Sequence, residues 1–87
     1  MTLQRRAREF LERPVPEDID YVEGSLAERL LTAYAEEGRI DSDPEQLELL
    51  ELCLQETRGA EQEGSPARRA WFKESGDLLE AILAETS

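Results

Sequence analysis

The chain has 87 residues, of which 21 are acidic and ten are basic, so its net charge at neutral pH is −11. This length suits one domain with a small core, and 13 leucines and nine alanines against two valines and three isoleucines favour helix over sheet. The composition argues against several classes of protein. Histidine, the commonest general base and metal ligand, is missing, the single cysteine cannot form an internal disulfide, and no apolar run approaches the length of a membrane span.

The first predicted helix covers residues 2–13. Leu3, Ala7 and Phe10 recur with the spacing of one narrow apolar stripe, and Pro14 ends the segment. This segment holds four arginines against two glutamates, whereas residues 17–63 hold three arginines against 15 acidic residues. We therefore expect the arginines of the first helix to pair with carboxylates of other segments or of a neighbouring copy.

Residues 14–24 are predicted to form a loop, because two prolines favour an extended start. Pro16 and the two acidic residues after it are typical of a single helical turn. We expect the apolar residues of this segment to anchor the loop on the core: Val15, Ile19 and Val22.

The second predicted helix covers residues 26–37. Ser25 and Glu28 have the spacing of a capping box, in which each side chain bonds the backbone of the other, and Gly38 is a typical helix stop. About five residues connect this helix to the next one, a usual length between antiparallel neighbours. The second and third helices are therefore predicted to form an antiparallel hairpin.

The third predicted helix, residues 44–58, has the strongest local signals. Asp43 is a good N-cap, Pro44 fits the first helical position, and Gly59 is a natural stop. Its leucines lie on more than one side: Leu47, Leu50 and Leu54 form one stripe, and Leu49 and Leu52 lie away from it. A helix that is apolar on several sides is either the central helix of a bundle or one shared with a partner.

The fourth predicted helix covers residues 66–85. Ser65 and Pro66 repeat the cap followed by proline, and the apolar phase continues across Gly76, which favours one long helix with Gly76 as the position of any bend. Together the segments predict an all-α fold, a small four-helix bundle in a single domain of residues 1–87.

Neither catalysis nor metal binding is favoured by these residues. Cys53 lies in the most apolar helix, whereas a nucleophilic thiol needs a partly exposed, electropositive setting. Asp41, Asp43 and Glu45 resemble the start of a calcium loop, but Gln46 replaces the required glycine and Leu52 replaces the bidentate glutamate. We therefore predict no catalytic residue, no cofactor and no metal site, and no enzyme activity.

Two surfaces are candidates for function. The apolar excess predicts a partner interface, either a homodimer or a tight complex, made by five residues: Leu49, Leu52, Cys53, Trp71 and Phe72. The acidic middle of the chain predicts a second surface, which is either simply solvated or imitates nucleic acid: Glu36, Glu37, Asp41, Glu45, Glu48 and Glu51.

Two function classes therefore stay open. The first is a protein–protein interaction module, such as an adaptor, regulatory or assembly factor, that works through helix packing as a homo-oligomer. The second is an acidic inhibitor or neutralising partner of a basic protein, for example one that binds nucleic acid. In both, the partner is a protein or a second copy of this chain, and direct binding of nucleic acid, a membrane or a small-molecule substrate is not expected. A cytoplasmic location is the default expectation.

Overall fold

The computed structural model describes residues 2–41 and 43–86, apart from the side chains of residues 21 and 23. It contains four helices: α1 (Leu3–Glu12), α2 (Tyr21–Glu37), α3 (Pro44–Ala60) and α4 (Pro66–Thr86). These described residues contain no strand. The predicted all-α four-helix bundle is confirmed, and the helix boundaries of α1, α3 and α4 differ from the predicted ones by two residues or fewer.

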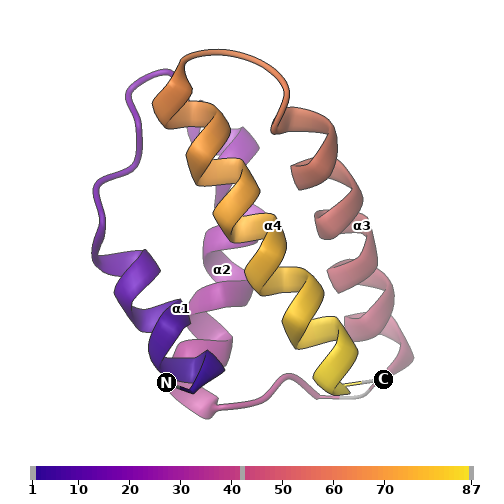
Figure 1. Cartoon of the computed structure of the whole chain (residues 1–87). Coiled ribbons are helices and arrows are strands. Elements are labelled where there is room, and N and C mark those ends of the chain that lie inside the picture. Colours follow the sequence, from indigo (N-terminus) through magenta and orange to yellow (C-terminus); the bar gives the residue numbers. More distant parts are fainter. Residues whose placement is uncertain (1, 42, 87) are drawn as a thin grey trace.

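The four helices run alternately in opposite directions, so the start of α1 and the end of α4 lie at the same end of the bundle (Figure 1). The main packing pairs are α1 with α2 and α3 with α4. Helices α2 and α3 run in opposite directions and touch, as expected for a hairpin, although each packs more extensively on another helix. Among the described residues α1 and α3 do not touch, whereas α2 and α4 each contact the three other helices.

The central helix of the bundle is α4, and not the leucine-rich α3. Helix α4 buries eight residues: Arg68, Trp71, Phe72, Ser75, Gly76, Leu78, Leu79 and Ile82. Helix α3 buries only Leu50, Cys53 and Thr57. Leu78 and Leu79 are consecutive and both buried, so α4 faces protein on more than one side. The outer side of α3 is consequently left uncovered by the rest of the chain.

Small residues let α3 and α4 approach closely. A Cβ atom at Gly76 would lie 3.0 Å from Nη1 of Arg58 and 3.3 Å from Cγ2 of Thr57. Next to it, Ser75 is fully buried, and its hydroxyl donates to the carbonyl oxygen of Phe72 at 3.1 Å. Helix α4 continues through Gly76, as predicted. The glycine leaves room for α3, which occupies the space that a side chain at this position would need.

The N-terminal caps of α3 and α4 are confirmed. Asp43 Oδ1 accepts from the backbone N–H of Glu45 at 3.4 Å, and Pro44 begins α3. Ser65 Oγ accepts from the backbone N–H of Arg68 at 3.1 Å, and Pro66 begins α4. These signals depend on neighbours in the sequence alone, which is why they are readable without a structure.

The predicted start of the second helix is wrong, because α2 begins at Tyr21. Asp20 provides the N-terminal contact, with Oδ1 accepting from the backbone N–H of Val22 at 3.4 Å. Ser25 lies inside the helix, and its hydroxyl donates to the carbonyl oxygen of Val22 at 3.3 Å instead of capping. Gly24 packs closely within α2, since a Cβ there would lie 3.3 Å from Cγ2 of Ile19 and 3.4 Å from the ring of Trp71. The loop is thus shorter than predicted.

Only one of the three expected loop anchors reaches the core. Ile19 is 8% exposed, whereas Val15 is 42% and Val22 is 76% exposed. Because α2 starts at Tyr21, Val22 falls on the solvent side of a helix rather than in a loop that folds inward.

Polar side chains of the first predicted helix hold it against its neighbours. The predicted pairing of an arginine with a carboxylate of another segment is met by Arg13, whereas Arg5 pairs with Glu9 of its own helix. Gln4 Nε2 and Arg8 Nε donate to the carbonyl oxygen of Ala35, at 2.9 and 3.1 Å. That carbonyl lies in the last turn of α2, where backbone oxygens lack helical partners and positive charge is favourable. Arg13 also forms an ion pair with Glu74 of α4.

Candidate interaction surface

The structure places three of the five predicted interface residues inside the core of the chain. Cys53 is 2%, Trp71 is 6% and Phe72 is 1% exposed. The Trp71 ring lies 5.2 Å from that of Phe10 and 5.2 Å from that of Phe72, measured between centroids. These side chains offer almost no surface to a partner. Of the five predicted interface residues, the two that remain accessible lie on α3.

The two remaining residues differ in exposure. Leu49 is partly buried and packs against the core, whereas Leu52 is 50% exposed. Leu52 lies on the outer side of α3, between Glu48 and Glu56, which are four residues away in each direction and therefore its neighbours on the helix surface. An exposed leucine is common on protein surfaces, but this one lies in acidic surroundings on the uncovered side of α3.

Cys53 is unsuited to nucleophilic chemistry in this fold. Burial raises the pKa of its thiol, although its contact with the hydroxyl of Thr57 acts in the opposite direction. The same hydroxyl donates to the carbonyl oxygen of Cys53 at 2.7 Å. Because the thiolate is the reactive form, a buried thiol with a raised pKa is inert.

All six residues of the predicted acidic surface are exposed. Glu36 and Glu37 lie in the last turn of α2, Asp41 lies in the connection, and the three others lie on α3. Within residues 2–41 and 43–86, no basic side chain forms an ion pair with any of the six. We call this set (Glu36, Glu37, Asp41, Glu45, Glu48 and Glu51) the acidic side.

A shallow hollow of about 430 Å³ lies within the acidic side, at the end of the bundle where α2 leads into α3. Its lining combines apolar residues with charged or polar ones: Leu30, Ala33 and Ile40, and Glu37, Arg39, Asp41 and Gln46. We call it the α2–α3 hollow. The sequence did not predict an opening at this position.

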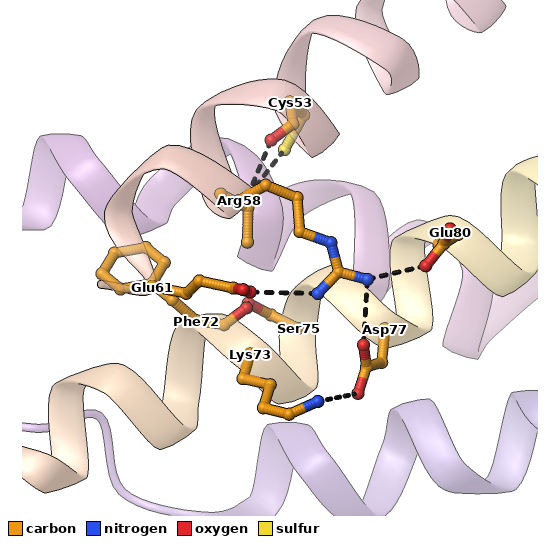
Figure 2. A network of polar contacts seen from close by, with 9 residues as sticks. Cys53, Arg58, Glu61, Phe72, Lys73, Ser75, Asp77 and Glu80 are labelled. Atoms are coloured by element: carbon orange, nitrogen blue, oxygen red, sulfur yellow. Dashed lines mark hydrogen bonds and ion pairs between the residues drawn. The ribbon is translucent and has the colours of Figure 1, made fainter. Parts of the chain in front are cut away.

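The sequence also did not predict the densest ion-pair network, which joins α3 to α4 (Figure 2). Arg58 Nη2 lies 2.9 Å from Asp77 Oδ1 and 2.7 Å from Glu80 Oε2, and Nη1 lies 3.0 Å from Glu61 Oε2. Lys73 Nζ adds a contact of 3.3 Å to Asp77. The hydrogen bond from Arg58 lowers the pKa of Asp77, and Asp77 in turn raises the pKa of Arg58.

The Arg58 network has a structural role, because each of its acids is compensated. An arginine near the end of one helix and acids three residues apart on another were the only available signal, and neither reveals that the two helices are adjacent. The acidic side differs from this network. Ion pairs neutralise the carboxylates between α3 and α4, whereas the carboxylates of the acidic side have no such partners among the described residues.

A second polar junction fastens the loop to the start of α4. Asp18 accepts from the backbone N–H and the hydroxyl of Ser65, both at 3.0 Å, and the backbone N–H bond lowers the pKa of Asp18. The buried Arg68 donates to the carbonyl oxygens of Asp18 and Glu63, both at 3.2 Å, and lies 4.8 Å from the ring centroid of Phe72. The basic and aromatic residues at the start of α4 therefore stabilise the fold.

Within the described residues, no group of three or more histidine, cysteine or acidic residues is arranged to hold a metal ion. None of the four helices is both long enough and apolar enough to cross a membrane in the part of the chain that is described.

Comparison with protein-family models, curated proteins and solved structures found no match for this chain.

Proposed function

We propose that this chain is a non-catalytic binding module whose acidic side docks onto a basic surface of another protein. The observation that carries the proposal is the uncompensated charge: six exposed carboxylates on α2, the connection and α3 lack an ion-pair partner among the described residues. A surface of one sign attracts a partner of the other sign and accelerates their encounter.

Charge also bears on the choice between another protein and a second copy. A symmetric dimer through the outer side of α3 would bring Glu45, Glu48 and Glu51 of both copies together. Two like charges 4 Å apart repel by about 1 kcal/mol in water and by about 4 kcal/mol near a protein surface. With only Leu52 substantially exposed there, the apolar gain from self-association is small. A basic partner is favoured over the homodimer for this reason.

The experiment compares two variants with equal changes in charge. One variant replaces Glu45, Glu48 and Glu51 of the acidic side by Lys. The control replaces three glutamates that are exposed outside the acidic side by Lys: Glu12, Glu17 and Glu63. Immobilised wild-type chain, variant and control are each incubated with a lysate of the source cells at low and high salt, and the retained proteins are identified by mass spectrometry.

The proposal predicts a basic protein that the wild type and the control retain, and that the α3 variant or high salt releases. Identical sets of retained proteins for the variant and the control would refute it, because the position of the charges would then be irrelevant.

A further inference from the structure

The α2–α3 hollow continues into an exposed ridge on α3. Gln46, which lines the hollow, is followed at intervals of three residues by Leu49 and Leu52. Residues three apart are neighbours on a helix surface, so these side chains form one line that leads out of the hollow. Gln46 at the start of this line is exposed, Leu49 in the middle is partly buried, and Leu52 at its end is 50% exposed.

The line is slightly shorter than two turns of helix. Leu52 is six positions after Gln46, which is about 9 Å along the axis of α3. In a partner helix, apolar side chains at positions i and i+7 are about 10.5 Å apart, and those at i+3 and i+4 lie between them on the same side. The first would enter the α2–α3 hollow, the middle ones would cover Leu49, and the last would contact Leu52.

Acidic residues border this line on both helices. Glu37 and Asp41 line the hollow, and Glu45, Glu48 and Glu56 flank Leu49 and Leu52 on α3. Arg39 is the only basic residue in the lining of the hollow. The surroundings therefore suit a helix with an apolar stripe and basic flanks, and they disfavour an acidic one.

We propose that the α2–α3 hollow and the Leu49–Leu52 ridge together bind one basic amphipathic helix of a partner protein. This inference rests on the proposed function and specifies its partner: the charges attract a basic protein, and the hollow and ridge select a helix with apolar residues at i, i+3, i+4 and i+7. Pockets for side chains on an otherwise charged surface provide such selectivity, because a partner binds well only if its apolar side chains are spaced to fit them.

The test uses a synthetic peptide of leucine and lysine, about 15 residues long so that it can form a helix, with leucines at helical spacing. A second peptide has the same composition in a scrambled order without an apolar stripe, and a third replaces lysine by glutamate. Each is titrated into the full, isotopically labelled chain, and two-dimensional NMR locates the backbone signals that shift.

The proposal predicts that the amphipathic lysine peptide causes saturable shifts at residues 30–41 and 46–52. The scrambled peptide should bind at least tenfold more weakly, and the glutamate peptide should not bind. Leu52→Gln should weaken the first interaction about tenfold, which corresponds to about 1.4 kcal/mol. Val15→Gln is the matched control, since Val15 is also an exposed aliphatic residue but lies in the loop before α2, and it should leave the affinity unchanged.

The outcomes separate the two proposals. If the scrambled peptide binds as tightly and shifts the same acidic residues, the helix-binding inference is overturned while charge-led binding survives. If the shifts map to α1 or the loop before α2, the inference is likewise overturned. If no basic peptide perturbs the acidic side at all, both proposals fail.

Discussion

Replacing Gly76 by Ala tests how closely α3 and α4 pack. Inside a helix, alanine is more favourable than glycine by about 1 kcal/mol. At position 76 the new Cβ would lie 3.0 Å from Arg58 Nη1 and 3.3 Å from Thr57 Cγ2. Both distances are shorter than an ordinary van der Waals contact of about 3.5–4.0 Å, so a neighbour has to move.

The structure indicates which neighbour moves. Thr57 is buried and its hydroxyl is bonded to the carbonyl oxygen of Cys53, whereas the Arg58 guanidinium is the end of a flexible side chain. Displacing it breaks ion pairs with α4 that are partly exposed, each worth about 0–1 kcal/mol. That loss offsets the gain in helix propensity, so we expect Gly76→Ala to change the free energy of unfolding by less than about 0.5 kcal/mol.

The same substitution should behave differently without the guanidinium. In an Arg58→Ala background only the 3.3 Å contact with Thr57 Cγ2 remains, so Gly76→Ala should be more stabilising than in the wild type, by at most about 1 kcal/mol, and the difference is the coupling energy of the pair. Urea unfolding followed by circular dichroism measures both values. Gly59→Ala is the control: no atom lies within 4 Å of a Cβ at this exposed helical position, so it should stabilise both backgrounds equally. An equal effect of Gly76→Ala in both backgrounds would refute the packing described here.

Three other predictions concern burial and titration. Leu79→Ala, at a fully buried site, should lower the free energy of unfolding by about 2–5 kcal/mol, whereas Leu52→Ala should change it by about 0.5 kcal/mol or less. Equal losses in urea unfolding would mean that Leu52 is covered. Burial and the 2.8 Å bond to Glu85 raise the pKa of Tyr34 to about 12, so its stabilising effect is complete below the unfolded pKa of about 10 and is lost as pH rises toward 12. Melting temperatures of Tyr34→Phe should therefore fall less than those of the wild type over that range, and parallel curves would contradict this assignment. The Cys53 thiol should react with an aromatic disulfide reagent at least about a hundredfold more slowly in the folded protein than in urea, and rapid reaction would show that it is accessible.

How far the fold was predictable depends on the range of the interactions involved. Asp43 with Pro44 and Ser65 with Pro66 mark helix starts through contacts within one turn, and both predictions were correct. The start of α2 was missed because glycine is unfavourable inside a helix and Ser25 resembles a cap, whereas the close packing of Gly24 against Ile19 and Trp71 depends on the tertiary structure.

The candidate surface shows the same division. Exposure of the six acidic residues agreed with their charge, because isolated carboxylates are costly to bury. The apolar residues were harder to place, because Cys53, Trp71 and Phe72 are suited equally to a core and to an interface. Their burial follows from the way the helices pack around α4, which the sequence alone does not show. In the Arg58 network, Arg58 lies 19 positions before Asp77 and 22 positions before Glu80. Predicting these contacts would have required knowing that α3 packs on α4.

We propose that the outer side of α3 faces a partner other than a second copy of the chain. Light scattering over a dilution series, at low and high salt and with reductant present, measures whether the chain associates with itself. We expect the mass of a monomer, 9.9 kDa, at every concentration and salt level. A dimer that persists on dilution and dissociates when Leu52 is replaced by Glu would contradict it, because α3 would then be used for self-association.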